Sequence, residues 1–381
     1  MTSTSCSEIA RDLLARAIAG ESPSVLPREL LDEACGQALF GILAEGLADR
    51  FEPALCEVYA TLFAQAVPGA EVERYRRVRR PRAVEGEPRT IFVLSRITLG
   101  ADIAVTSVLL DAAKRRFPQA RIVFVGPAKN YALFAADSRV AHAAVNYRRG
   151  TLADRLEVRH ELELLLATPD SLTIDPDSRL TQLGLLPVGV EARYHLFESR
   201  AYGGASDRSL PQLTADWAFE TFGVEGATPY VALADEPAHG DGIAVSFGVG
   251  ENPKKRLADP FEEKLLAMLA ESGMEICIDR GAGGEEAERV QRAVAGSGIR
   301  AHFWEGSFAG FASIIAASKL YVGYDSAGQH VASAAGVPLI TIFAGFPAPR
   351  MFDRWRPTAG AVIRVDDDDI DAVLGCLRSL L

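Results

Sequence analysis

The stretch YVGYDSAGQHVASAAGVPLITIFAGFP, residues 321–347, carries the clearest pattern of secondary structure in this chain. Its two ends are apolar and typical of buried strands, and the small residues between them predict a turn followed by a short helix. A strand, a helix and a strand in this order predict a parallel sheet. Such sheets bind ligands at the carboxyl ends of their strands, where the next helix presents free N–H groups, so the turn at Asp325 and Ser326 suits a phosphate.

The composition of the chain limits its class. Its 381 residues favour two domains, and its net charge of -11 argues against a general nucleic-acid binder. No apolar stretch is long enough to span a membrane, and the polar start lacks the pattern of a signal peptide, so we expect a cytoplasmic protein. The five cysteines form no C-x-x-C pair, which indicates neither a zinc site nor a disulfide framework, and we expect reduced thiols at Cys6, Cys35, Cys56, Cys277 and Cys376.

Residues 1–88 predict a helical extension, because their apolar residues recur at intervals of three and four. We expect this extension to pack on the first α/β half of the chain. It ends in ERYRRVRRPR, residues 73–82, which holds six arginines. This run is either a solvated helix end and linker or a surface that docks on an anionic membrane or acceptor.

Two α/β halves follow the extension, at residues 89–232 and 233–381. In each half, apolar strands alternate with turns of small residues and amphipathic helices, a pattern that predicts parallel sheets. A passage rich in Gly, Pro and Ala, residues 226–242, marks the boundary between them. The acidic run at 366–369 precedes a last helix, where its charge is favourable at the helix N-terminus. Two such halves suggest a ligand held in a cleft between them.

Several common ligands and reactions do not fit the spacing of residues. No G-x-G-x-x-G follows a strand, which disfavours NAD, and no G-x-x-x-x-G-K-[ST] is present for a P-loop. The chain also lacks the G-x-S-x-G of many hydrolases and the H-E-x-x-H of zinc proteases.

Three segments together carry a resemblance: LGADIAVTSVLLDAAKRRFPQARIVFVG (99–126), GVGENPKKRLADPFEEKLLAMLAESG (248–273) and VGYDSAGQHVASAAGVPLITIFAG (322–345). In order and separation they resemble the signature regions of the ADP-heptose heptosyltransferases, glycosyltransferase family 9. The resemblance covers residues 90–381. It implies the GT-B fold, in which two Rossmann-like domains face a cleft, together with an ADP-sugar donor, inversion of the anomeric centre, and no metal or cofactor.

The first segment places the family's aspartate at Asp102, with Ala101 where glycine is usual and Gly100 one position earlier. The resemblance implies that Asp102 is the general base, which such a reaction needs because the acceptor hydroxyl must lose a proton as it attacks. Gly100 and Ala101 are then expected on the acceptor side. The alternative is that Asp102 only caps a helix.

The second segment supplies cations. Lys255 matches the family's basic position after a strand that ends in glycine, here Gly250, and Lys254 is its rival. A lysine at this place would stabilise the negative charge on the departing diphosphate. The alternative is a cluster of surface charge.

The third segment matches the family's donor-binding turn, with Ala327 in place of its last glycine. Small side chains there would let the diphosphate approach the helix N-terminus, and His330 would either bond the phosphate or fix the loop. The positions that this segment assigns to the donor are Gly323, Asp325, Ser326, Ala327, Gly328 and His330.

Two further polar groups complete the expected site. Either Glu285 or Glu286 resembles the acidic residue of the family that contacts the ribose of the donor. At an apparent strand end of the first half, Asp175, Asp177 and Arg179 are candidates to line the acceptor side, the alternative being a solvated turn.

The sequence therefore predicts a metal-independent, inverting glycosyltransferase that transfers a sugar, expected to be heptose, from an ADP-sugar. Its acceptor would be a glycolipid, a lipopolysaccharide core or a protein, with peripheral contact to the inner face of the membrane through Arg74–Arg82. The alternatives are a GT-B-fold sugar-nucleotide epimerase and a catalytically inactive scaffold that binds a nucleotide-sugar.

Overall fold

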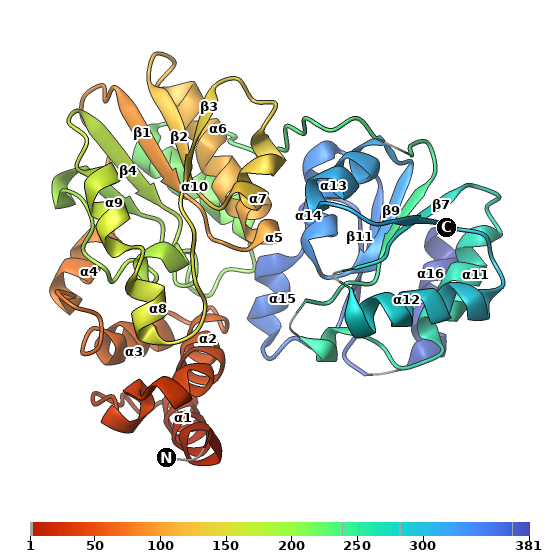
Figure 1. The fold of residues 1–381 in the computed structure, drawn as a ribbon, viewed down its shortest axis with the longest axis horizontal. Coiled ribbons are helices and arrows are strands. Elements are labelled where there is room, and N and C mark those ends of the chain that lie inside the picture. Colours follow the sequence, from red (N-terminus) through yellow and green to blue (C-terminus); the bar gives the residue numbers. More distant parts are fainter. Residues whose placement is uncertain (1–2, 238, 251, 282, 368) are drawn as a thin grey trace. The chain divides into compact units, whose positions relative to one another are not determined.

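The computed structural model describes residues 3–237, 239–250, 252–281, 283–367 and 369–381. It divides into two compact units, each built around one parallel sheet (Figure 1). The α/β class with two sheets is therefore confirmed, whereas the predicted boundaries at 88 and 232 stay predictions. The first unit comprises Met1–Thr98, Val105–Tyr131 and Ser138–Thr228, and the second comprises Leu99–Ala104, Ala132–Asp137 and Pro229–Leu381.

The sheet of the first unit has the strand order β3-β2-β1-β4-β5, with every neighbouring pair parallel. The order reverses between β1 and β4, so their carboxyl ends form the kind of switch point where open α/β sheets bind ligands. The strands are β1 (Thr90–Leu94), β2 (Arg121–Gly126), β3 (Val140–Ala144), β4 (Ser171–Asp175) and β5 (Tyr194–Leu196).

The two faces of this sheet pack against different helices. Phe92 and Leu94 of β1 belong to one apolar core with the helical extension and helix α9 (Arg159–Leu166). Because side chains alternate along a strand, the opposite face receives the intervening residues, and there α6 (Ser107–Arg116) and α10 (Leu210–Phe222) pack together (Figure 1).

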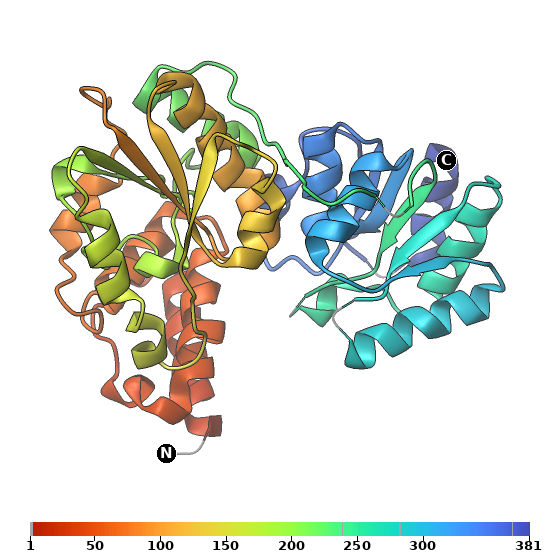
Figure 2. The ribbon, with the colours of Figure 1, turned by 45° about the horizontal axis from the view of Figure 1, so that its top comes forward.

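The helical extension packs on the first α/β half, as the sequence predicts. Figure 2 shows its red and orange helices beside α8 (Leu152–Leu156), and a Cβ on Gly36 would lie 3.1 Å from the Gly150 carbonyl oxygen that precedes α8. Its elements are α1 (Ser3–Ile18), η1 (Arg28–Leu31), η2 (Glu33–Cys35), η3 (Ala38–Ala44), α2 (Glu45–Ala48), α3 (Pro53–Phe63) and α4 (Val72–Val78).

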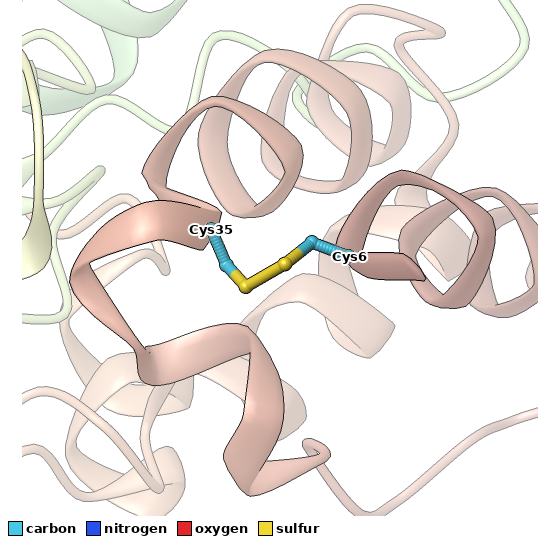
Figure 3. Close-up of a disulfide and its surroundings, with 2 residues drawn as sticks. All are labelled: Cys6 and Cys35. Atoms are coloured by element: carbon cyan, nitrogen blue, oxygen red, sulfur yellow. A yellow bond between two sulfur atoms is a disulfide. The ribbon is translucent and has the colours of Figure 1, made fainter. Parts of the chain in front are cut away.

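A disulfide joins Cys6 of α1 to Cys35 of η2, and both residues are buried (Figure 3). The expectation that all the cysteines are reduced thiols is therefore wrong for this pair. Cysteine spacing does not reveal the pairing, because helix packing brings together two positions 29 residues apart. Free thiols remain at Cys56, Cys277 and Cys376.

The arginine run at 74–82 is largely neutralised inside the first unit. Arg74 is buried, and four further arginines of the run bond to carboxylates or carbonyls, whereas Arg80 is exposed. The side chains of Arg76 and Arg77 are still 41% and 56% exposed, so the run is only partly engaged within the first unit, and both interpretations of it stay predictions. The partners are the Gly184 carbonyl for Arg74, Glu57 for Arg76 and Arg79, and Glu191 for Arg77 and Arg82.

The sheet of the second unit has the order β11-β10-β9-β6-β7-β8 and is also parallel throughout. Its strands are β6 (Ile243–Ser246), β7 (Ile276–Asp279), β8 (His302–Trp304), β9 (Leu320–Tyr324), β10 (Leu339–Phe343) and β11 (Ala361–Arg364). Its helices are α11 (Phe261–Ala270), α12 (Gly284–Ser297), α13 (Phe308–Ala317), α14 (Ala327–Ala335), α15 (Pro349–Trp355) and α16 (Ile370–Leu380).

The acidic run before α16 acts at the helix N-terminus as predicted, because Asp369 accepts a hydrogen bond from the Ala372 N–H at 3.0 Å. Among the helices described, none is long and apolar enough to cross a bilayer. The short elements not yet named are α5 (Leu99–Ala101), η4 (Asp102–Thr106), α7 (Ala128–Tyr131), η5 (Ala132–Phe134), η6 (Arg179–Thr181), η7 (Glu191–Arg193) and η8 (Pro253–Lys255).

Candidate functional site

The N-terminus of α14 lies at the carboxyl edge of the second sheet. Strand β9 pairs with β6 on one side and β10 on the other, so all three strands end at this edge. Ser326 occupies the N-cap position of α14 in an extended conformation, but its hydroxyl makes no capping bond to the first turn within the described part of the chain. The first N–H groups of the helix therefore suit an anion.

Lys255 reaches this helix terminus from the η8 turn. Its Nζ lies 2.6 Å from Asp325 Oδ2 and donates a second hydrogen bond, of 3.2 Å, to the Asp325 carbonyl oxygen. Lys254, in contrast, is exposed. The fold thus brings the second and third predicted segments together, and Lys255 rather than Lys254 is the cation held at the start of α14.

Asp325 is also bound from within the helix. It is buried, and its Oδ1 accepts a hydrogen bond from Nε2 of Gln329, which is fully buried one helical turn further on. Sequence reasoning missed Gln329, although the spacing of four residues from Asp325 is the signal that could have found it. The carboxylate is therefore a fixed link between Lys255 and α14.

His330 lies beside this link. It is buried, its ring centroid is 5.8 Å from that of Trp355, and its Nε2 is 3.4 Å from Gln329 Nε2. Burial lowers the pKa of His330 to about 4, although the nearby Asp325 acts in the opposite direction. The imidazole is neutral near pH 7, so it offers a single N–H donor and no positive charge to a phosphate.

The glycines of the third segment are needed for packing around a tyrosine. A Cβ on Gly323 would lie 2.6 Å from the Tyr321 hydroxyl, and one on Gly328 would lie 2.2 Å from it. The sequence interpretation explained these small residues by the approach of a diphosphate. The buried ring of Tyr321 already requires them.

Gly345 permits the close approach of the Lys255 turn. Its φ of +66° suits glycine, and a Cβ there would lie 2.1 Å from the Lys254 carbonyl oxygen. Asn252 Nδ2 donates to the Gly345 carbonyl oxygen at 3.4 Å, and Gly250, with φ +59°, lies earlier in the same loop. Sequence reasoning did not single out Gly345.

Glu286 and Glu285 have different environments at the start of α12. The Glu286 side chain packs over two glycine turns, since its carboxyl group lies 2.6 Å from a Cβ built on Gly281 and 2.9 Å from one on Gly248. These turns follow β7 and β6, at the carboxyl edge of the sheet. Glu285 is exposed. The geometry therefore favours Glu286 as the acidic residue that faces the edge.

Asp102 lies inside a helical stretch. It is fully buried and is the first residue of the π-helical segment η4, which continues α5. The cap alternative requires a residue that precedes its helix, and Asp102 follows three helical residues instead. Residues 99–104 belong to the second unit, where a Cβ on Gly100 would lie 3.0 Å from His330 Cδ2, and Ala101 is buried.

Asp175 and Asp177, which were expected at the acceptor side, are buried in the first unit. Asp175 accepts hydrogen bonds from the Ser178 N–H (2.7 Å) and the Thr181 hydroxyl (2.5 Å), and burial raises its pKa to about 6. Asp177 forms an ion pair with Arg200 at 2.5 Å. The solvated-turn alternative is therefore wrong, because both carboxylates support the loop after β4 from within.

Arg179, the third candidate for the acceptor side, faces the helical extension. Its Nη1 donates to Glu45 Oε1 at 2.9 Å.

No group of three His, Cys, Asp or Glu side chains with metal-binding geometry is found in the described part of the chain.

Comparison with known proteins places this geometry in a family. Residues 188–366 match the family model of glycosyltransferase family 9 (heptosyltransferase). No curated protein sequence matches the chain. The match to the family therefore includes the η8 turn with Lys255 and the whole of α14.

Solved structures share the fold at low sequence identity. The Escherichia coli heptosyltransferase WaaC with ADP is 18% identical with a TM-score of 0.60, over 77% of this chain and 100% of that one. A glycosyltransferase family 9 protein of Veillonella parvula is 15% identical with a TM-score of 0.57, over 78% and 92%. The E. coli ADP-heptose lipopolysaccharide heptosyltransferase II is 18% identical with a TM-score of 0.52, over 76% and 98%.

The family resemblance, the GT-B-like fold and the enzyme class predicted from the sequence are confirmed by these matches. Residues 188–366 match glycosyltransferase family 9 (heptosyltransferase), and the chain is a glycosyltransferase with the fold of the solved heptosyltransferases.

Proposed function

We propose that the chain transfers a sugar, a heptose, from an ADP-sugar to an acceptor hydroxyl, with inversion at the anomeric carbon and without a metal ion. The observation that carries the proposal is the Lys255–Asp325 ion pair at the N-terminus of α14. Lys255 and the helix N–H groups there supply the positive charge that a leaving diphosphate requires, which is the role a metal ion plays in other transferases.

The reaction is a single displacement. The acceptor oxygen forms its bond to the anomeric carbon while the bond from that carbon to the diphosphate oxygen breaks, and the acceptor proton passes to Asp102. The electron pair of the broken bond leaves with ADP, whose charge Lys255 and the start of α14 stabilise. Attack on the face opposite the leaving group inverts the configuration.

The choice of ADP as the leaving group has two supports. Solved proteins of the same fold are described with ADP and as ADP-heptose transferases. In this chain Glu286 packs over the glycine turns after β6 and β7, a place where its carboxylate would accept hydrogen bonds from ribose hydroxyls. We assign the ribose contact to Glu286 and not to Glu285.

The acceptor in this proposal is a glycolipid, a lipopolysaccharide core or a protein side chain. Peripheral membrane contact through Arg74–Arg82 gains no support, since most of these arginines bond within the first unit.

A panel of nucleotide diphosphates tests the donor. A nucleotide at a hundred times its dissociation constant stabilises the native state by about 2.7 kcal/mol, which a thermal-shift assay detects. We expect ADP to give the largest increase in melting temperature. A larger shift with UDP or GDP would overturn the assignment of the donor.

A product assay tests the reaction. We expect release of ADP from ADP-heptose to depend on an added acceptor. Isomerised ADP-sugar without ADP release would indicate the epimerase alternative, and nucleotide binding with neither product would indicate the inactive scaffold.

A further inference from the structure

Tyr321 lies under the first turn of α14, inside the second unit. It is the second residue of β9, and its side chain is fully buried. Because side chains alternate along a strand, the phenol shares a face of the sheet with Gly323. A Cβ on Gly323 would lie 2.6 Å from the Tyr321 hydroxyl oxygen, and one on Gly328 of α14 would lie 2.2 Å from it. The phenol therefore extends along the strand and ends at the helix N-terminus.

The hydroxyl of Tyr321 occupies a polar space between the sheet and the helix. In the register of the sheet, Ser246 of β6 and Thr341 of β10 flank Gly323. Burial raises the pKa of Tyr321, while Ser326 and Ser246 lie close enough to act in the opposite direction. The N-cap residue of α14 is thus a neighbour of this buried phenol.

Packing alone does not explain the hydroxyl group of Tyr321. It forms no hydrogen bond of normal geometry with the residues that the structure describes. A buried hydroxyl that has lost its water without gaining a partner is destabilising, and such groups are rare in folded proteins. Phenylalanine would fill the same space between the same glycines without this cost. The hydroxyl therefore calls for a functional explanation.

Ser326 departs from the usual arrangement of an N-cap serine. Such a serine normally accepts a hydrogen bond from the N–H of the second or third helical residue, here Gly328 or Gln329. Within the described chain Ser326 makes no such bond, although its backbone has the extended conformation of an N-cap. A capping serine would compete with a ligand for these N–H groups. The uncapped start of α14 therefore leaves them available to an anion.

We propose that Tyr321 is a positioning residue for the diphosphate of the donor and acts through Ser326. With the diphosphate bound, the Tyr321 hydroxyl donates to the Ser326 oxygen, and the Ser326 hydroxyl donates to a phosphate oxygen. Engaged in this way, Ser326 does not cap the helix, so the N–H groups of Gly328 and Gln329 are free for the ligand. The inference rests on the proposed function, which places a diphosphate at this helix N-terminus.

The direction of each hydrogen bond follows from the chemistry of the ligand. A charged phosphate oxygen only accepts, so Ser326 must donate to it, and the lone pairs of the serine oxygen remain for another donor. Tyr321 supplies that donor from the sheet. A hydroxyl that accepts one hydrogen bond becomes a stronger donor in the next. Tyr321 therefore strengthens phosphate binding without contact with the ligand.

Calorimetric titration of Tyr321→Phe, which removes the hydroxyl and keeps the ring, tests the inference. The probes are ADP and inorganic pyrophosphate. We expect both to bind about 3- to 10-fold more weakly than to the natural chain, the worth of one hydrogen bond. If Tyr321→Phe does not fold, Tyr321→Met replaces it, because methionine also lacks the hydroxyl and adapts to irregular spaces.

The matched control is Tyr230→Phe. It makes the same change elsewhere in the second unit, where the Tyr230 hydroxyl donates to Asp137 Oδ2 at 2.9 Å. We expect this variant to bind ADP and pyrophosphate as the natural chain does.

Two further measurements separate positioning from a structural role. Without ligand, the urea midpoint of Tyr321→Phe should equal or exceed that of the natural chain, because a hydroxyl without a partner adds no stability. In a Ser326→Ala background, the change of Tyr321 to Phe should alter ADP affinity by less than about twofold, because the residue through which Tyr321 acts is absent.

Three results would each overturn the inference. The first is ADP binding by Tyr321→Phe that equals that of the natural chain. The second is a loss of affinity accompanied by a lower urea midpoint, which indicates a structural role. The third is an undiminished loss in the Ser326→Ala background.

The pyrophosphate titration distinguishes failure of this inference from failure of the proposed function. If the natural chain binds pyrophosphate but not ADP, the donor assignment is wrong, and pyrophosphate affinity decides the role of Tyr321. If the natural chain binds neither, both proposals are wrong.

Discussion

Lys255 Nζ lies 2.6 Å from Asp325 Oδ2, and this ion pair ties the η8 turn to the N-terminus of α14. The two residues are 70 positions apart in the chain. Because Asp325 is also bound by Gln329, the pair has a fixed position at the carboxyl edge of the second sheet. A cation held in this way is placed for a ligand before the ligand arrives, which lowers the entropic cost of binding.

Lys255→Ala should therefore weaken ADP binding about 10- to 100-fold, the worth of one charge-assisted contact. The matched control is Lys254→Ala, which removes an exposed lysine from the same turn and should change the dissociation constant less than threefold, or about 0.6 kcal/mol. Calorimetric titration of ADP measures both. Equal losses in the two variants, or the larger loss in Lys254→Ala, would contradict the assignment.

Arg74 and Arg80 should behave differently although they belong to one run. Arg74 is buried, donates to the Gly184 carbonyl oxygen at 3.3 Å and lies 5.0 Å from the ring centroid of Tyr194. Arg74→Ala should lower the free energy of unfolding by about 1–3 kcal/mol. Arg80→Ala should change the free energy of unfolding by less than about 0.5 kcal/mol, as measured by chemical denaturation.

Sedimentation with anionic vesicles extends this comparison. We expect Arg80→Ala to leave vesicle association unchanged, since the run is engaged within the first unit. If Arg80→Ala is as stable as the natural chain but no longer sediments with the vesicles, the exposed end of the arginine run docks on membranes.

Glu198 predicts a pH dependence of stability. It is buried between Tyr75, whose hydroxyl donates to it, and Arg79, 3.4 Å away. Burial raises the pKa of Glu198 to about 7, although Arg79 and the Tyr75 hydrogen bond act in the opposite direction. A carboxyl group with a raised pKa in the folded state contributes stability that is complete below its unfolded pKa, about 4.5, and is lost as the pH rises through 7.

Glu198→Gln mimics the protonated carboxyl group at every pH, so the variant does not lose stability through this position as the pH rises. The stability of the variant relative to the natural chain should therefore increase between pH 5 and pH 8, by up to about 3 kcal/mol. Urea denaturation at each pH measures the difference. A difference that is constant over this range, or that decreases, would show that Glu198 is ionised in the folded protein throughout.

The alternation of strands and helices could be predicted from the sequence because it depends on local periodicity. The strand at Leu320–Tyr324 and the helix at Ala327–Ala335 are where the pattern of residues 321–347 indicates. Short elements such as β5 (Tyr194–Leu196) and β11 (Ala361–Arg364) were not predicted. Such segments are too short to establish a period, and their pairing with a neighbouring strand defines them.

The sequence could predict the residues of the site only where a single segment contains a recognisable motif. Asp325 and Lys255 could each be selected from the sequence by motif. Their ion pair could not be predicted, because it depends on the fold that brings together two distant segments of the chain. The need for glycine at position 345 could not be predicted either, because it comes from the close approach of the Lys254 carbonyl oxygen, 91 residues earlier in the chain. The burial of Asp175 could not be anticipated either, since a polar strand end suggests a solvated turn until the extension is seen to cover the first unit.

The role of Asp102 as base is the prediction on which the proposed mechanism depends most. It is fully buried at the first residue of η4, a π-helical segment of the kind that is frequent at functional sites. Asp102→Asn keeps the shape of the side chain but cannot accept the proton of the acceptor hydroxyl. Transfer should therefore fall about 10²- to 10⁴-fold, the usual contribution of general base catalysis.

Affinity for ADP should hardly change in Asp102→Asn, because the proton moves only in the transition state. Ser326→Ala should show the reverse pattern, with weaker ADP binding and a smaller effect on turnover at saturating donor. Turnover with purified acceptor and titration of ADP separate the two. If Asp102→Asn folds, binds ADP and retains near-normal turnover, Asp102 is structural. The base must then be another carboxylate, and Asp175, with its pKa raised by burial to about 6, is the next one to replace.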